Sequence, residues 1–227
     1  MILLFDLDGT LLDSNDIWRQ IDVAFLAKRG IPWTEAYNEG VIHATFPTAA
    51  RFTKQFCQLT ESEAEIMREW RAMAFHAYSN EIPLKAGVAA FLEDCAKKRV
   101  PMAIYTSCEE DLCYAALDHH GIRHYFRKIL FARKLGVEKS APEGFHAVAR
   151  LLETKPNRCL FFDDSPVACQ GAKNAGMYVI GCKDPLFSSY QRKMESFCDD
   201  YLESFAHFPS QYVIQSLLTE KKPADQT

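Results

Sequence analysis

The sequence has little that would place the chain at a membrane or on nucleic acid. No apolar run approaches the roughly 18 residues that a bilayer-spanning helix needs. The first residues turn acidic at Asp6 without a basic segment, so no signal peptide is expected. Basic residues are outnumbered: 26 lysines and arginines stand against 30 aspartates and glutamates, a net charge of −4. Nucleic acid and anionic membranes usually require a basic footprint, so we expect neither as a partner and predict a cytoplasmic protein.

The eight cysteines show no spacing typical of a metal site or a disulfide framework. No C-x-x-C or Cys/His pattern occurs, and several cysteines take apolar positions of expected helices or strands, among them Cys95 and Cys159. Reduced thiols of this kind usually serve as small core side chains. We therefore expect free cysteines, as is usual in the cytoplasm.

Five short apolar runs have the length and composition of buried β-strands: residues 2–6, 100–106, 128–131, 159–163 and 177–182. Helical patterns lie between the last four. One contains Leu112 and ends near Gly121, and another follows Pro142. A third begins at Ser165, followed by proline, and ends at Gly176. Strands that alternate with helices indicate an α/β protein with a parallel sheet covered on both faces.

One long segment interrupts this alternation because it contains no convincing strand. Apolar residues follow helical spacing after Ile17 and again after Ile66, and Thr60 and Glu63 have the spacing of a capping box. A chain of 227 residues, 48% of them hydrophobic, is large enough for one core and a modest insert. We predict a core of residues 1–14 and 84–227 and a helical insert of residues 15–83.

Two of the expected strands end in acidic residues. Asp6 and Asp8 follow the first strand and, by the two-residue period of an extended chain, point to the same side. Asp163 and Asp164 end the fourth strand. The carboxyl ends of parallel strands lie at one edge of the sheet, so these four carboxylates would be close together. Two unit charges about 4 Å apart repel by roughly 4 kcal/mol at an effective dielectric near 20. A cation would relieve this repulsion, and oxygen ligands alone favour Mg²⁺ over zinc.

Two plainer interpretations of the first acidic pair are weaker. Asp6 and Asp8 could be solvated residues of a polar turn, or they could open an EF-hand loop. An EF-hand needs glycine at its sixth position, whereas Gly9 is fourth. The second acidic pair argues against a simple polar turn.

The second expected strand ends at Thr106 and Ser107, whose hydroxyls and backbone amides suit a phosphate oxygen at the same edge. This signal is weak alone, because Ser and Thr are common where strands end. Lys139 precedes the helix opened by Pro142. Taken alone, such a lysine is more often a solvated surface charge.

Together these residues resemble the haloacid dehalogenase (HAD) superfamily, and the resemblance covers nearly the whole chain. Asp6-Leu-Asp8-Gly-Thr is similar to its first motif and Thr106 to its second. Lys139 in Lys-Ser-Ala-Pro is similar to the third, and Phe-Phe-Asp163-Asp-Ser-Pro to the fourth. The closest resemblance is to the phosphoglycolate phosphatase and β-phosphoglucomutase-like branch. It implies a Rossmann-like core and makes the insert an α-helical cap.

The resemblance implies an enzyme, a Mg²⁺-dependent phosphatase that acts on a small phosphorylated metabolite. Asp6 would be the nucleophile, and Asp8 the general acid and base, with its main-chain carbonyl on the metal. Thr106 would hold a phosphoryl oxygen, and Lys139 would neutralise the phosphate and orient Asp6. The metal ligands implied are Asp6, Asp8, Asp163 and Asp164.

Asp8 also discriminates within the superfamily. Members that displace halide need no general acid at this position, and phosphonate-cleaving members carry a small residue there. A sugar phosphomutase remains an alternative because it uses the same residues but retains the phosphoryl group. A phosphate-binding protein without turnover ranks third, since no motif residue is lost. The identity of the substrate and the oligomeric state stay open.

Some positions depart from the usual motifs or lie outside them. Ser140 replaces a usual proline, and Ser107 replaces a frequent asparagine, which makes Ser107 a candidate substrate contact. For Cys108 a structural role is expected, because Asp6 already supplies a nucleophile. Residues 42–48 of the insert are a candidate specificity loop, with His43 and Thr45 as candidate substrate contacts. A plain connection between helices is an equal alternative.

Overall fold

The computed structural model describes residues 1–41 and 44–208. The chain divides into two compact units, and each is described separately. One unit is formed by Met1–Ser14 together with the chain from Pro83 onward, and the other by Asn15–Ile82. Among the helices of the described residues, none is both long and apolar enough to cross a membrane.

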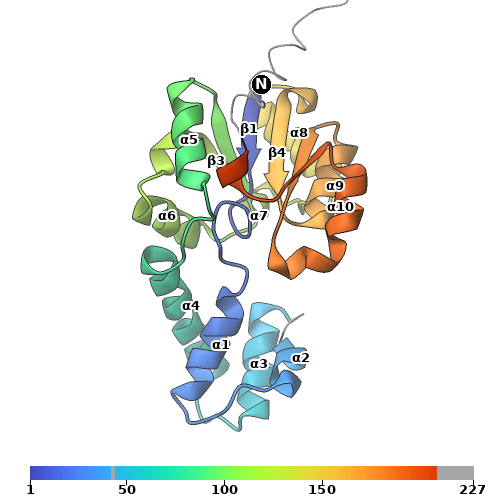
Figure 1. Cartoon of the computed structure of the whole chain (residues 1–227). Helices are drawn as coiled ribbons and strands as arrows, with labels where there is room; N and C mark the ends of the chain where they lie inside the picture. Colours follow the sequence, from blue (N-terminus) through green and yellow to red (C-terminus); the bar gives the residue numbers. More distant parts are fainter. Residues whose placement is uncertain (42–43, 209–227) are drawn as a thin grey trace, which may run out of the picture. The chain divides into compact units, whose positions relative to one another are not determined.

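A parallel β-sheet forms the centre of the first unit (Figure 1). Its order is β3-β2-β1-β4-β5-β6, so β1 lies between β2 and β4. The strands are β1 (Ile2–Phe5), β2 (Met102–Thr106), β3 (Phe126–Phe131), β4 (Cys159–Asp163), β5 (Tyr178–Cys182) and β6 (Asp200–Leu202). All five expected strands are present, and their ends differ from the expected ones by at most two residues. The prediction missed β6, because a three-residue edge strand has no apolar run to reveal it.

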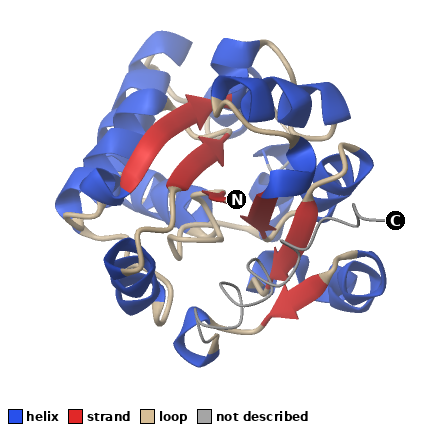
Figure 2. Cartoon of the chain, turned by 90° about the horizontal axis from the view of Figure 1, so that it is seen from above, coloured by secondary structure: helices blue, strands red, loops and turns tan. Residues whose placement is uncertain are grey.

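Helices cover both faces of this sheet, which Figure 2 shows from above. The helices of this unit are α5 (Val88–Lys97), α6 (Glu110–His119), α7 (Ala132–Leu135), α8 (Pro142–Leu151), α9 (Pro166–Asn174) and α10 (Gln191–Phe197). One face packs against α8, α9 and α10, where Leu4 and Phe161 meet Phe145 and Met194 in a continuous buried cluster. The α/β fold with a parallel sheet is therefore confirmed.

Aromatic side chains fill the opposite face. Phe5 and Phe162 lie on neighbouring strands with ring centroids 4.8 Å apart in a stacked arrangement. Phe91 of α5 meets both rings edge-on, at 6.2 Å and 6.1 Å, and Phe205 packs beside them. Each fully buried side chain of this size contributes roughly 1.5–3 kcal/mol. Strong packing on both faces holds the central strands, and hence their carboxyl ends, in fixed positions.

The chain leaves and re-enters this unit through two segments that lie side by side. Leu12 forms an isolated antiparallel bridge with Leu84, and the amide of Asp13 donates a hydrogen bond of 3.0 Å to the carbonyl of Pro83. The second unit is inserted between these two points.

The described residues of the second unit form the helices α1 (Ile17–Ala27), α2 (Glu35–Val41), α3 (Phe46–Phe56) and α4 (Glu63–Asn80). Phe25 and Trp70 pack edge to face at 5.5 Å between α1 and α4. A capping box opens α4, but Ser62 and Glu65 form it. The expected Thr60 and Glu63 pair was two residues too early, because Ser62 offers the same local chemistry nearer to the first turn.

A buried hydrogen-bond network ties α1, α2 and α3 together. The Tyr37 hydroxyl donates to Asp22 Oδ1 at 3.1 Å and lies 2.9 Å from Thr53 Oγ1. Tyr37 and Thr53 are fully buried. Burial raises the pKa of Asp22 to about 6, although the hydrogen bond from Tyr37 lowers it in part.

The raised pKa of Asp22 makes this unit less stable as the pH rises. The folded chain binds this proton more tightly than the unfolded chain, so the stabilisation is complete below about pH 4 and is lost through pH 6. We expect the free energy of unfolding to fall by about 1–2 kcal/mol between pH 4 and 7, after allowance for partial solvent screening. Urea denaturation should show a flatter pH profile for Asp22→Asn. Glu39→Gln, which changes an exposed carboxylate of α2, should keep the wild-type slope, and parallel profiles for Asp22→Asn and wild type would contradict the assignment.

Candidate active site

Asp6 follows β1 directly and lies at the middle of the sheet edge. Its amide donates a hydrogen bond of 2.9 Å to the carbonyl of Phe162, which extends the pairing with β4. Alternation along the strand puts the Asp6 side chain on the same face as Leu4. The residue is only 6% exposed, so its carboxylate is held in a largely dry environment.

The acidic residues at the end of β4, Asp163 and Asp164, lie close to Asp6. Carboxylate oxygens of Asp6, Asp163 and Asp164 all lie within 4.8 Å of one another, and all three residues are buried. Asp163 Oδ1 accepts a hydrogen bond of 2.7 Å from the amide of Ser165. Asp164 Oδ1 accepts one of 3.2 Å from the buried hydroxyl of Thr10. The structure thus brings together three of the four predicted acidic residues.

Lys139 is buried beside these carboxylates and is not a solvated surface charge. Its ammonium lies 2.5 Å from Asp6 Oδ1 and 2.7 Å from Asp163 Oδ2. The rings of Tyr105 and Phe161 flank it, with centroids 5.6 Å and 5.4 Å from Nζ. Such contacts fix the ammonium by charge and by the aromatic faces.

Gly171 of α9 allows the loop that carries Lys139 to pack closely against this helix. A Cβ at this position would lie 2.6 Å from the carbonyl oxygen of Lys139 and 2.9 Å from that of Ser140. Both contacts are with backbone, which cannot yield without moving the loop. The absence of a side chain at Gly171 therefore helps to position the lysine.

Burial and charge oppose each other in this cluster. Burial raises the pKa of Asp6 well above its ordinary range; Lys139 lowers it, and Asp163 and Asp164 raise it further. Burial alone would lower the pKa of Lys139, but the charges and hydrogen bonds of Asp163 and Asp6 raise it above its usual value. Three carboxyl groups around one ammonium leave an excess of negative charge, so a further cation would stabilise the ionised form of Asp6.

Asp8 lies outside the group of three carboxylates. It is partly exposed, and its Oδ1 accepts a hydrogen bond of 2.7 Å from Ser14 Oγ. Gly9 follows in the left-handed conformation, with φ 76°, which turns the chain immediately after Asp8. The side chain of Asp8 is thus oriented by a different partner from those of Asp6.

Thr106 ends β2 beside β1 and is buried. Its Oγ1 accepts a hydrogen bond of 3.0 Å from the amide of Cys108. Ser107 is exposed. Burial raises the pKa of the Cys108 thiol, and nearby Asp8 raises it further, so this thiol stays protonated, in keeping with the structural role expected for it.

The candidate contacts of the insert are placed only in part. Thr45 is exposed and precedes α3, where its hydroxyl lies 2.8 Å from that of Thr48. His43 lies outside the described residues.

Three residues that shape the site were not predicted from the sequence: Thr10, Ser14 and Gly171. Thr10 sits inside the first motif, so its position offered a local signal. Ser14 and Gly171 act across loops or between elements, and nothing in their neighbouring sequence indicates the contact.

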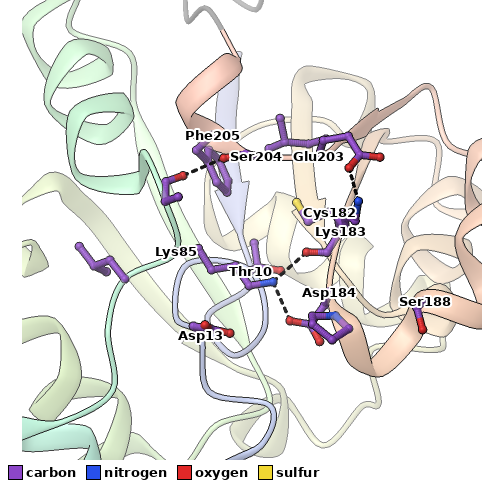
Figure 3. A pocket seen from close by; sticks show the side chains of 14 residues that line it. Thr10, Asp13, Lys85, Cys182, Lys183, Asp184, Ser188, Glu203, Ser204 and Phe205 are labelled. Carbon is purple, nitrogen blue, oxygen red and sulfur yellow. Dashed lines mark hydrogen bonds and ion pairs between the residues drawn. The ribbon is translucent and has the colours of Figure 1, made fainter.

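A pocket of about 340 Å³ opens in the core unit beside Thr10 (Figure 3). Lys85 donates a hydrogen bond of 2.6 Å to Asp184 Oδ2 and one of 2.8 Å to the carbonyl of Lys183. Asp184 is buried, and its Oδ1 accepts a hydrogen bond of 2.9 Å from the amide of Leu186. These bonds join the loop after β5 to the segment before α5.

The fold and the site together define an α/β enzyme with an acidic centre at the carboxyl ends of its parallel strands. The family model described as haloacid dehalogenase-like hydrolase matches residues 3–182. The chain belongs to this family of hydrolases, which confirms the resemblance found in the motifs.

Individual relatives agree with this assignment. The chain is 28% identical over 185 residues to the fructose-1-phosphate phosphatase YqaB of Escherichia coli, covering 78% of this chain and 94% of the relative. It is 29% identical over 220 residues to a probable pseudouridine-5'-phosphatase of Drosophila melanogaster, covering 92% of each. A putative β-phosphoglucomutase of Thermotoga maritima superimposes with a TM-score of 0.82 at 19% identity, over 95% of this chain and 98% of that one. The last comparison supports the fold alone.

Proposed function

We propose that this protein is a Mg²⁺-dependent phosphatase that hydrolyses a small phosphorylated metabolite through an aspartyl phosphate on Asp6. One observation carries the proposal. Three buried carboxyl groups converge within 4.8 Å, and the ammonium of Lys139 pairs with two of them, Asp6 and Asp163. A site with this excess of buried negative charge is suited to a divalent cation and, through it, to a phosphate dianion.

The ligand set fits magnesium. Asp6, Asp163 and Asp164 offer oxygen atoms only, which Mg²⁺ prefers, and few protein ligands suffice because this ion keeps several waters. The main-chain carbonyl of Asp8 is proposed as a further ligand. When bound, the ion would supply charge neutralisation on the phosphoryl oxygens.

The chain's own residues would perform the transfer. Asp6 is the proposed nucleophile because it matches the first residue of the first motif and Lys139 holds its carboxylate in place. Covalent capture divides a difficult displacement into two easier steps. Asp8, oriented by Ser14, would donate a proton to the leaving oxygen and later activate water. Thr106 and Lys139 would bind phosphoryl oxygens and stabilise charge as the bond breaks.

The names of the relatives support a small phosphorylated substrate, and we propose that residues 15–82 act as a cap that helps to select it. Ser107 of the core and Thr45 and His43 of the insert remain the proposed substrate contacts. The proposed location is the cytoplasm.

Removal of divalent metal should abolish the activity. We expect EDTA to eliminate hydrolysis of p-nitrophenyl phosphate and added Mg²⁺ to restore it, because the three carboxylates would otherwise repel an incoming dianion. Mg²⁺ should also raise the melting temperature, since it binds only the folded cluster. The direct measurements are released inorganic phosphate and a thermal unfolding curve, each with and without the ion.

A panel of sugar phosphates, phosphoglycolate and nucleotides would then define the substrate. Release of phosphate supports a phosphatase, whereas conversion of a sugar phosphate to its isomer supports the phosphomutase. Hydrolysis that continues unchanged in EDTA would refute the metal-dependent proposal.

A further inference from the structure

Lys85 and Asp184 form a buried ion pair in the core unit that the proposed reaction does not use (Figure 3). The ammonium of Lys85 lies 2.6 Å from Asp184 Oδ2, and the two side chains are 16% and 1% exposed. The same ammonium donates a hydrogen bond of 2.8 Å to the carbonyl of Lys183. A buried charge is stable only when its partner stays in place, so this pair fixes Lys85 against the loop that follows β5.

The main chain of Lys85 holds the loop that follows β1, residues 7–12, which we call the first-motif loop. The amide of Lys85 donates a hydrogen bond of 2.9 Å to the carbonyl of Leu11, and Leu84 forms the antiparallel bridge to Leu12. Within the loop, the amides of Leu11 and Leu12 both donate bonds of 2.9 Å to the carbonyl of its first residue. The loop is therefore a compact turn that is attached directly to Lys85.

The first-motif loop carries Thr10, which contacts the acidic cluster. Thr10 is fully buried, and its hydroxyl donates a hydrogen bond of 3.2 Å to Asp164 Oδ1. Thr10 directly precedes Leu11, the residue that accepts the bond from the amide of Lys85. A short path of bonds thus leads from the ion pair to a carboxylate that we propose as a metal ligand.

The sheet topology places the ion pair across the end of β4. Strand β4 lies between β1 and β5, and Asp163 at its end pairs in register with Gly181 of β5. The first-motif loop follows β1, and Asp184 comes two residues after the end of β5. Through Lys85, the ion pair therefore connects the loops of the two strands that flank the acidic end of β4.

We propose that Lys85 is a positioning residue, whose ion pair with Asp184 holds the first-motif loop and so orients Asp164 as a metal ligand. Lys85 acts through the loop and touches neither the metal nor the substrate. Removing the partners that orient metal ligands typically lowers metal affinity or activity by about 10- to 100-fold. The effect on the metal rests on the proposed function, whereas the attachment of the loop does not.

The Mg²⁺ affinity of Lys85→Met tests this role. We expect isothermal titration calorimetry of the full chain with Mg²⁺ alone to show an affinity about tenfold below that of the wild type. The kcat for p-nitrophenyl phosphate should stay close to the wild-type value once Mg²⁺ is saturating, because no reacting group is lost. Lys85→Arg keeps a cation beside Asp184 and should restore most of the affinity. A pair that only stabilised the fold would leave the affinity for Mg²⁺ unchanged.

Two further variants test the specificity and the route of the effect. Lys183→Met is the matched control, because Lys183 lines the same pocket but pairs with Glu203 at the surface, and it should bind Mg²⁺ like the wild type. Thr10→Val keeps the shape of the side chain and removes the hydroxyl that bonds to Asp164, so it should also weaken Mg²⁺ binding. Adding Lys85→Met to Thr10→Val should cause no further loss, since both act through the same bond. Additive losses would overturn the route through Thr10.

Hydrogen exchange of the metal-free chain provides a readout that needs neither metal nor turnover. The amides of Leu11 and Leu12 should exchange faster in Lys85→Met than in Lys183→Met or wild type, because the loop has lost its attachment. Unchanged exchange at these amides, or wild-type Mg²⁺ affinity in Lys85→Met, would overturn the proposal. If Lys85→Met does not fold, wild-type Mg²⁺ affinity in Thr10→Val overturns it instead. A wild type that binds no Mg²⁺ would refute the proposed function, and the exchange rates would still decide whether Lys85 holds the loop.

Discussion

Asp6→Asn is expected to lower kcat/KM for phosphoester hydrolysis by at least about 10⁴-fold. The amide cannot attack phosphorus, and the covalent route is lost with it. Substitution by the isosteric amide keeps the shape of the buried pocket around Lys139. Steady-state kinetics on p-nitrophenyl phosphate with saturating Mg²⁺ give the ratio directly.

The same substitution at a surface position provides the control. Asp94→Asn changes a carboxylate of α5 that pairs with Lys98, the residue that follows this helix, and its kinetics should match the wild type. Acid-quenched protein should retain labelled phosphate in the wild type and not in Asp6→Asn. Comparable hydrolysis rates for Asp6→Asn and wild type would exclude Asp6 as the nucleophile.

Lys139→Met should combine a large loss of activity with a loss of stability. Removal of one partner from a buried ion pair typically costs about 3–5 kcal/mol, because the remaining charge is left unpaired. Here two carboxylates lose their cation, at 2.5 Å and 2.7 Å. The free energy of unfolding, measured by urea denaturation without metal, should therefore fall by about this amount.

Magnesium separates the two parts of this effect. The ion should restore part of the stability of Lys139→Met, because it neutralises the same carboxylates, while activity stays low. Lys97→Met removes an exposed lysine that pairs with Glu93 along α5, and it should unfold like the wild type. If Lys139→Met were as stable as wild type in metal-free buffer, the buried ion pair would have no energetic role.

The elements that carry the site could be predicted because their signals are local. The strands that end at Asp6 and Asp163 are short apolar runs followed directly by acidic residues, and the topology of a parallel sheet brings such ends together. Boundaries were less accurate: the capping box of α4 lies two residues later than expected. Strand β6 was missed because a three-residue edge strand is specified by its neighbour, β5, and hardly by its own composition.

The contacts that tune the site could not be predicted from local patterns. Taken alone, Lys139 is typical of a surface charge, and only the four motifs together predicted that it orients Asp6, which lies 133 positions earlier. Its burial depends on ion pairs with Asp6 and Asp163. The role of Gly171 depends on how closely α9 packs on the Lys139 loop, which is a property of the folded chain.

The adjacency of Leu12 and Leu84 has a consequence for how this architecture diversifies. Because the segments that contain Leu12 and Leu84 are already bridged, the core does not have to change when the insert between them changes. Closing a longer excursion costs little, about 0.6 kcal/mol for each doubling of its length. The sheet can therefore stay unchanged while the inserted helical unit is exchanged, lengthened or reshaped. The reactive carboxylates keep their positions at the ends of the strands.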